Sequence, residues 1–395
     1  MGLPKIVLKS GKDLPVLRYH PWIFSGAIDA VSEDLKDGDI AEVFNSKGKY
    51  LATGHFQDSS IAVKIFTFKQ QPIDRNFWYS RLAAAFELRK QQNLVTNPLT
   101  NCYRLVHNEG DSLPGLIIDM YDRTAVIQAH SAGMYLQRET FADVLLQLYD
   151  NQLDGIYNKS AETLYKNTGA KTDNGWLRGS GNECIALENG CRFTIDIEGG
   201  QKTGFFLDQR ENRAKAGSYA KSRKVLNMFS YTGGFSVYAL KSGAEIVHSV
   251  DSSAPACKLA EENIALNGID GLRHKSMAAD ARQFLENADA GMYDMIILDP
   301  PAYAKTTASR HNAIKGYTAL NAVAMKKIGS NGILFTFSCS QVVSREQFNA
   351  AVAAAAIESG RRVQVLEQLG QSGDHPINIF QPESEYLKGL VLRIE

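Results

Sequence analysis

From Val225 onward, short apolar runs alternate with stretches of helical spacing. Val225–Phe229, Glu245–Val250, Met295–Leu298 and Ile333–Phe335 have the length of buried strands. This alternation predicts βαβ units and a parallel sheet covered by helices. In an open α/β sheet, binding and catalytic groups gather at the carboxyl ends of the strands. The residues that follow each apolar run are therefore the first candidates for a functional site.

A glycine loop follows the first of these runs. Ser230–Gly234 reads Ser-Tyr-Thr-Gly-Gly, and a helix is expected from about Phe235. The start of a helix offers free backbone N–H groups and the positive end of the helix dipole. The spacing is not Gly-x-Gly-x-x-Gly, so a nicotinamide dinucleotide site is not indicated. Asp251 ends the next strand, where such folds hold a ribose by its hydroxyls. The alternative for Asp251 is the N-cap of a helix that begins at Ala254.

Two further acids follow strands. Asp280 comes at the expected end of the third strand, and ligand binding and helix capping explain it equally well. Asp299 precedes Pro300 and Pro301, which stop the strand and stiffen the turn because proline fixes φ and cannot donate to a ladder. A carboxylate on a stiff turn is pre-positioned, as a catalytic group must be.

Cys339 lies between Ser338 and Ser340, directly after the last apolar run. A thiol beside an acid at this edge of a sheet suggests covalent catalysis. The alternative is a small buried hydrophobic residue, the usual state of a free cysteine. The pattern contains no Cys-x-x-Cys pair and no zinc-like spacing, so it predicts no metal site. A reducing cytoplasm fits best, and four thiols are assigned to structure: Cys102, Cys184, Cys191 and Cys257.

The chain of 395 residues is too long for one ordinary core. Residues 1–72 contain short strands at Ile6–Leu8, Ile40–Phe44 and Ile61–Phe66, separated by turns. Residues 73–187 mix a helix over Ile73–Gln92 with strands and a second helix over Tyr135–Tyr149. Residues 188–395 contain the alternating pattern. We therefore expect three domains with these limits: a β-rich module, an α+β domain and an α/β domain.

Lys plus Arg and Asp plus Glu each number 43, so the net charge is zero and any site for nucleic acid must be local. One basic strip lies within residues 199–224, with two acids, Asp208 and Glu211, among its cations. It could contact phosphates, although such runs are usually solvated surface. No apolar run approaches the length of a membrane span. The basic residues of the strip are Lys202, Arg210, Arg213, Lys215, Lys221, Arg223 and Lys224.

These motifs together resemble class I S-adenosylmethionine (SAM) methyltransferases, and most closely the RlmI family of 23S ribosomal RNA cytosine-5 methyltransferases. The match rests on Gly204–Arg210, Asn227–Phe235, Leu298–Pro301 and Ser338–Ser340. The resemblance implies an N-terminal PUA-like β-barrel that binds RNA, a central α+β domain and a Rossmann-like α/β methyltransferase domain. It also implies a cytoplasmic enzyme of rRNA processing with 23S rRNA as partner, and it leaves a homodimer open. By resemblance the SAM site is lined by Phe206, Asp208, Arg210, Phe229, Ser230, Gly233, Asp251, Asp280 and Asp299.

The resemblance implies that Cys339 adds to C6 of the target cytosine while Asp299 stabilises the ring, giving 5-methylcytosine. Many related enzymes carry a second cysteine beside the Pro-Pro turn, whereas Ala302–Lys305 follows it here. Three other functions remain open: an amino methyltransferase, a guanine-N7 RNA methyltransferase, and a non-catalytic RNA-binding factor for ribosome assembly. Neither of the two other enzymes would need the thiol.

Overall fold

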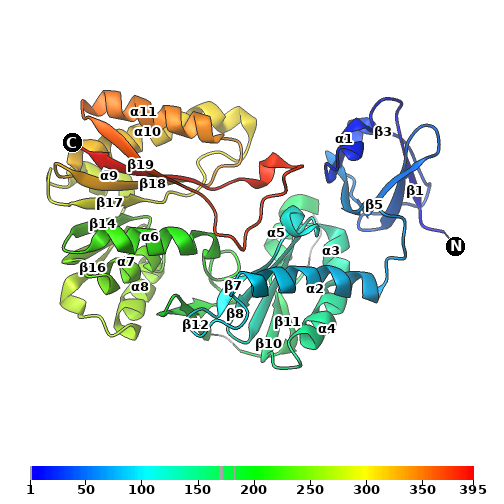
Figure 1. The fold of residues 1–395 in the computed structure, drawn as a ribbon, viewed down its shortest axis with the longest axis horizontal. Helices are drawn as coiled ribbons and strands as arrows, with labels where there is room; N and C mark the ends of the chain where they lie inside the picture. Colours follow the sequence, from blue (N-terminus) through cyan, green and yellow to red (C-terminus); the bar gives the residue numbers. More distant parts are fainter. Residues whose placement is uncertain (1, 169–171, 182) are drawn as a thin grey trace. The chain divides into compact units, whose positions relative to one another are not determined.

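Figure 1 shows the computed structural model, which describes residues 2–168, 172–181 and 183–395. The chain forms two compact units, each built from several segments. The first unit comprises Met1–Ala186, Ile195–Leu207 and Gly373–Ser384. The second comprises Leu187–Thr194, Asp208–Ser372 and Glu385–Glu395. The three domain limits expected from the sequence stay a prediction.

The N-terminal part of the first unit is a small β module with one sheet in the order β2-β6-β5-β4-β1-β3. All three strands expected here are present, and a turn at Asn45 joins β4 to β5, where the Asn45 side chain accepts the backbone N–H of Lys47 and Lys49. β1 pairs with β4 in parallel, and its Ile6 and Leu8 are buried in the core of the module. The elements are β1 Lys5–Leu8, α1 Leu14–Leu17, β2 Trp22–Phe24, β3 Ile28–Val31, β4 Ile40–Phe44, β5 Tyr50–Phe56 and β6 Ile61–Thr67.

The middle part of the first unit is an α+β fold whose sheet has the order β11-β10-β9-β8-β7. The expected helix over 73–92 is α2, capped by Asp74 and buried along Phe77, Leu82 and Ala85. The helix expected over 135–149 is two helices, which meet at Gln137. The elements are α2 Arg75–Gln91, β7 Cys102–His107, β8 Leu116–Tyr121, β9 Thr124–Ala129, α3 Ala132–Leu136, α4 Arg138–Leu148, β10 Gly155–Asn158, α5 Ala161–Thr168 and β11 Gly175–Gly179.

A segment from much later in the chain completes the first unit. Asp374 is fully buried there, and its Oδ2 accepts the backbone N–H of Arg104 at 2.9 Å. The carbonyl of Asp374 accepts Nη2 of Arg89 at 2.9 Å, and the same guanidinium forms a buried ion pair with Asp111. The interior of the first unit therefore depends on residues more than 250 positions apart, as the separations of 270 and 285 show.

The second unit contains the parallel sheet that the sequence predicts. Its order is β16-β15-β14-β17-β18-β20-β19, with the first five strands parallel and β20 antiparallel to both of its neighbours. The strands are β14 Lys224–Met228, β15 Ile246–Asp251, β16 His274–Ala278, β17 Met295–Leu298, β18 Gly332–Ser338, β19 Val363–Leu369 and β20 Lys388–Ile394. β12 Glu183–Glu188 and β13 Cys191–Asp196 form a separate two-stranded sheet, and their residues are divided between the units.

Helices cover both faces of this sheet. Figure 1 shows α9, α10 and α11 on one face and α6, α7 and α8 on the other. The fully buried Leu226, Ile296 and Leu334 come from adjacent strands and pack in the cluster that includes residues of α9 to α11. The doubly covered sheet explains why its strands read as continuous apolar runs. The helices are α6 Arg210–Ala220, α7 Gly234–Lys241, α8 Ala254–Leu266, α9 Ala281–Asn287, α10 Arg310–Lys327 and α11 Arg345–Ser359. Across the described part of the chain, no helix combines the length and apolarity needed to cross a membrane.

Candidate active site

The predicted site residues follow the carboxyl ends of five neighbouring parallel strands. Phe229 follows β14, Asp251 ends β15, Asp280 follows β16, Asp299 follows β17 and Cys339 follows β18. Because these strands are parallel and adjacent, the five positions lie along one edge of the sheet. The sequence therefore predicted the edge correctly, while the role of each residue stays a prediction.

The glycine loop is held in a tight, partly left-handed conformation. Phe229, Tyr231 and Gly233 have φ values of 58°, 44° and 78°. At Gly233 a β-carbon would lie only 2.9 Å from the β-carbon of Ala260, so glycine is needed for close packing as well as for φ. The loop leads directly into α7, whose N-terminus points its free N–H groups to this edge.

Asp251 holds the glycine loop in place. Its Oδ2 accepts the backbone N–H of Tyr231 at 2.9 Å, and its Oδ1 accepts that of Ser253 at 2.9 Å. The N-cap of α8 is Ser253, so the capping alternative for Asp251 is wrong. Asp280 does cap its helix, because its Oδ1 accepts the N–H of Gln283 at 2.8 Å in the first turn of α9. A ligand contact by Asp280 stays a prediction.

Among the described residues, several polar atoms near this edge are buried without a hydrogen-bond partner, and two of them belong to predicted site residues. They are Oγ of Ser230, in the glycine loop, and Oδ1 of Asp208. The other oxygen of Asp208 accepts the hydroxyl of Tyr386 at 2.6 Å. A buried polar atom without a partner costs free energy unless a ligand satisfies it. The hydroxyl and the carboxylate oxygen therefore fit a polar cofactor with donors and acceptors, such as SAM.

Burial raises the pKa of Asp299 to about 7, and the nearby Asp208 carboxylate acts in the same direction. The amide of Gln209 donates to Oδ1 of Asp299 at 2.9 Å, which opposes the shift. The Gln209 amide is oriented in turn by Asn212, whose Nδ2 donates to its Oε1 at 2.6 Å. Asp299 can therefore carry a proton near neutral pH, and with Oδ1 engaged as an acceptor the free position is Oδ2.

Cys339 lies beside the Asp-Pro-Pro turn. Its Sγ is 3.8 Å from the carbonyl oxygen of Pro300, and its side chain is partly exposed. β17 and β18 pair in parallel with Leu298 opposite Thr336, and this pairing brings the two strand ends together. The thiol and the turn predicted from separate motifs are therefore neighbours in space.

The other four cysteines differ from Cys339 in their surroundings. Burial raises the pKa of Cys184 to about 12 and that of Cys191 to about 11. Burial also raises the pKa of Cys257, which lies on α8 with its Sγ 3.7 Å from the carbonyl of Asp251. Cys102 is fully buried in β7, and no disulfide joins any of the five thiols. Thiols with raised pKa values are poor nucleophiles, which agrees with a structural role.

The basic strip is not one continuous phosphate surface. Arg213 is 3% exposed and forms a buried bidentate ion pair with Glu188 at 2.7 and 2.6 Å. Arg210 is also buried, and its Nε lies 3.2 Å from Glu211. Lys221 and Lys224 are exposed, but Lys224 begins β14 at the edge of the sheet opposite to Cys339. The strip hypothesis is wrong for the two arginines, because both side chains are buried and each already contacts a carboxylate of the protein.

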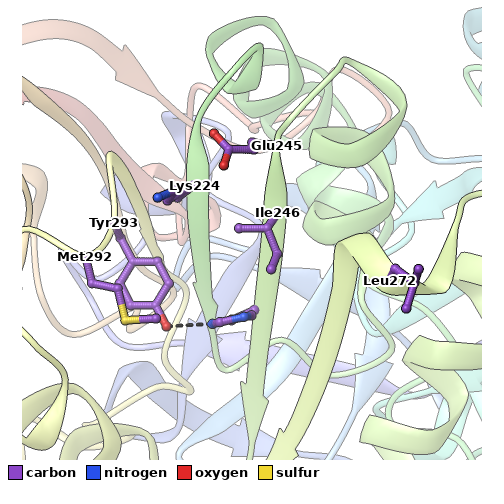
Figure 2. Close-up of a pocket in the computed structure, with 7 residues that line it drawn as sticks. Lys224, Glu245, Ile246, Leu272, Met292 and Tyr293 are labelled. Carbon is purple, nitrogen blue, oxygen red and sulfur yellow. Dashed lines mark hydrogen bonds between the residues drawn. The ribbon is translucent and has the colours of Figure 1, made fainter.

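A cavity of about 400 Å³ lies away from the predicted site (Figure 2). Lys224 and Ile246 line it and are the first residues of β14 and β15. Tyr293 also lines it, and its hydroxyl is hydrogen-bonded to Nδ1 of His248 at 2.8 Å, the contact drawn in Figure 2. The cavity therefore opens at the amino edge of the sheet, whereas the candidate active site occupies the carboxyl edge.

Sequence reasoning missed two residues of this region. Gln209 contacts Asp299 across 90 positions, and Lys388 contacts Ser340 across 48. Gln209 stands inside the Gly204–Arg210 motif, so its neighbours could have drawn attention to it. Lys388 is a cation directly before the apolar run of the strand Lys388–Ile394, and a charge in that position was the available signal. Phe206, predicted for the SAM site, belongs to the first unit, and its role stays a prediction.

Two protein families match separate segments of the chain. The S-adenosylmethionine-dependent methyltransferase family matches residues 162–317, and a PUA-like domain matches residues 6–68. The ribosomal RNA large subunit methyltransferase I of Tolumonas auensis is 41% identical over 98% of each chain, and that of Aeromonas salmonicida is 40% identical over 98% of each chain. The chain belongs to the ribosomal RNA large subunit methyltransferase I family. It is a SAM-dependent methyltransferase with an N-terminal PUA-like domain.

Solved structures share the fold. A SAM-dependent methyltransferase from Streptococcus mutans has a TM-score of 0.84 at 22% identity and covers 98% of this chain and 99% of its own. A methyltransferase complexed with SAH has the same TM-score at 23% identity, with the same coverage. The expected architecture of PUA-like module, middle α+β region and Rossmann-like sheet is therefore confirmed.

Proposed function

We propose that this enzyme methylates C5 of one cytosine in 23S ribosomal RNA through a covalent bond between Cys339 and C6. The observation that carries the proposal is the position of Cys339 beside the Asp299–Pro301 turn, with Sγ 3.8 Å from the Pro300 carbonyl. The family relatives supply the substrate class, since they are named as methyltransferases of large-subunit ribosomal RNA. A substrate of this kind agrees with an enzyme of the cytoplasm.

The chemistry explains why a thiol and an acid are needed together. C5 of cytosine is a weak nucleophile until the sulfur of Cys339 bonds to C6, which makes C5 electron-rich. Charge then develops on the ring, and Asp299 can hold a proton at N3 because its pKa lies near 7. After C5 has been methylated, a base removes the C5 proton, the ring double bond re-forms and sulfur leaves as thiolate.

Bound SAM supplies the electrophilic methyl group. We assign its contacts to the glycine loop: the buried hydroxyl of Ser230 would face the cofactor, and Gly233, which packs against Ala260, would offer its backbone at the start of α7. Asp251 would accept hydrogen bonds from the ribose hydroxyls while it keeps the loop in place. Asp208, whose Oδ1 has no partner, would accept a further donor of the cofactor. Arg210, Phe229 and Asp280, which belong to the second unit, complete the proposed set.

An amino methyltransferase is the second candidate, because enzymes of that class also carry an Asp-Pro-Pro turn. In those enzymes an aromatic residue commonly follows the turn directly and stacks on the target base. Here Ala302 intervenes, and the ring of Tyr303 lies 4.8 Å from that of Tyr317 at an interplanar angle of 31°. The aromatic residue therefore already has a partner within the protein. Such an enzyme would also have no use for a partly exposed thiol at the strand end.

The decisive experiment uses 23S rRNA fragments that contain 5-fluorocytosine, in which fluorine replaces the C5 proton and blocks release. With SAM, the wild-type protein should form an RNA adduct that survives denaturant. Cys339→Ala should still bind SAM, since binding does not require the thiol, but should lose both the adduct and methylation of normal RNA. The matched control is Cys257→Ala, whose thiol is buried and should be dispensable. Methylation by Cys339→Ala at an appreciable rate would point to an amine or N7 target instead.

A further inference from the structure

Two independent contacts join Lys388 to the residues on either side of Cys339. It opens β20 and pairs with Ser338 in the antiparallel register of β18 and β20. Its Nζ donates to the carbonyl oxygen of Ser340 at 2.7 Å. Ser338 and Ser340 are the residues on either side of Cys339, so the lysine is tied to the backbone before and after the thiol. All of these residues belong to the second unit.

The ammonium group of Lys388 is buried, with the residue only 2% exposed. Buried charges in proteins are normally paired. Within the described part of the chain, no carboxylate lies at ion-pair distance from Nζ: the nearby Glu385 is engaged by Arg345 at 2.7 Å. The hydroxyl of Tyr317 is occupied by Oγ of Ser340 at 3.0 Å. The cation therefore has a main-chain acceptor but lacks an anion.

Burial lowers the pKa of Lys388 to about 8, while the charges of Cys339 and Glu385 raise it and that of Arg345 lowers it further. An interaction between two ionisable groups is reciprocal, so a lysine stabilised by the thiolate stabilises that thiolate in return. The pKa of Lys388 lies close to that of an ordinary thiol, about 8.5. This lysine and an ordinary thiol therefore bind a proton with similar affinity.

We propose that Lys388 is the positioning residue that keeps Cys339 as a thiolate. In the neutral state of the pair, the amine nitrogen takes the thiol proton: the S–H bond breaks, an N–H bond forms, and an ammonium–thiolate pair results. The freed electron pair on sulfur is then available for the bond to C6. When that bond breaks, the same ammonium stabilises the departing thiolate. This inference rests on the proposed role of Cys339 and adds the group that activates it.

The test measures the thiol directly and requires neither RNA nor SAM. The full-length protein is treated with iodoacetamide across a pH series, and mass spectrometry follows the peptide that contains Cys339. In the wild type, the midpoint of the alkylation profile should lie below about 8.5, the value of an ordinary thiol. In Lys388→Met and Lys388→Gln, the midpoint should rise by at least about one unit, so alkylation at pH 7 should slow about tenfold.

The two variants separate charge from hydrogen bonding. The glutamine amide can still donate to the Ser340 carbonyl but carries no charge, so a purely structural lysine would be replaced by glutamine without effect. Lys327→Met is the matched control, because Nζ of Lys327 also donates to a carbonyl, that of Ala288, at 2.6 Å in the same unit. This control should alkylate as the wild type does.

Three results would overturn the proposal: a wild-type midpoint at or above that of an ordinary thiol, an unchanged profile in both Lys388 variants, or a normal profile in Lys388→Gln alone. The first needs no variant, so a folding defect cannot obscure it. Failure of the proposed function has a different signature. Wild-type protein that forms no adduct with 5-fluorocytosine RNA would refute cytosine-5 chemistry, while the alkylation profiles would still report on the lysine and the thiol.

Discussion

At the scale of single residues, the environment of Asp299 is what distinguishes it from an ordinary surface carboxylate. Burial raises its pKa, and Gln209 holds one of its oxygens. Its pKa of about 7 in the folded protein exceeds the ordinary value of 3.8, so the folded state binds more protons between these two values. Stability should therefore fall as pH rises from about 4 to about 7.

Asp299→Asn should remove this loss, because the amide stays neutral while its oxygen still accepts from Gln209. We expect the variant to be more stable than the wild type at pH 8 by on the order of 2–4 kcal/mol, and nearly equal to it at pH 4. Urea unfolding of both proteins across this range measures the difference. A gain of the same size at pH 4 and pH 8 would show that packing, and not the proton, is responsible. Methylation should be strongly reduced in the variant at either pH.

The sequence made Cys339 and Asp299 candidates for the site because each follows a strand within a recognisable motif. It did not identify Gln209 or Lys388, since nothing local marks their partners. Contacts across 90 and 48 positions depend on how the strands are ordered in the sheet, and on side chains that reach across it. For the same reason, the sequence placed Arg213 on a phosphate surface, although a buried partner, Glu188, lies 25 positions earlier.

At the scale of elements, the strand–loop–helix units carry the predicted cofactor site. The apolar runs and the glycine loop were readable because each is short and bounded by turn residues. The order β18-β20-β19 could not be read from the sequence, because antiparallel strands at the end of a parallel sheet leave no distinct periodicity. The break between α3 and α4 at Gln137 was also missed, since both helices continue one apolar pattern.

Asp251→Ala tests the loop as an element. The change removes the acceptor for the N–H of Tyr231 and the proposed bonds to the ribose, so SAM affinity should fall by roughly 1.5–3 kcal/mol, or at least tenfold. Isothermal titration with SAM measures this loss. Asp270→Ala is the matched control, because Asp270 also accepts a backbone N–H, that of Leu272, but precedes β16 at the opposite edge. Equal SAM affinities in the two variants would contradict the proposed contact between the cofactor and Asp251.

At the scale of the whole molecule, zero net charge means that binding to RNA must come from local groups. With two arginines of the basic strip buried, the exposed segment between β1 and β2 is a better source of phosphate contacts. It exposes Lys12, Arg18 and the aromatic ring of Tyr19 in the PUA-like domain. Cations and an exposed aromatic ring suit a flexible RNA chain.

We therefore expect the affinity for a 23S rRNA fragment to fall steeply with salt despite the balanced charge. Lys12→Ala together with Arg18→Ala should lower the slope of log affinity against log salt concentration by about 2 units, one for each phosphate contact. Lys221→Ala with Lys224→Ala is the matched pair, located at the amino edge of the second unit's sheet. Fluorescence anisotropy at several salt concentrations gives the slopes. Equal slopes for the two double variants would exclude the PUA-like segment.

The segment that carries Asp374 has a consequence for how the protein is made. Residues 373–384 complete the first unit, yet a ribosome synthesises them only after nearly all of the second unit. The contacts of Arg89 and of the Arg104 backbone with Asp374 therefore cannot form until most of the chain has been translated. Successive domains usually fold in the order of their synthesis, with the N-terminal domain first. Here the N-terminal half cannot reach its final state before residues 373–384 have been synthesised. Cutting the gene between the two expected domains at residue 187 would leave the N-terminal fragment without residues 195–207 and 373–384 of its own unit, and those residues would be carried by the other fragment.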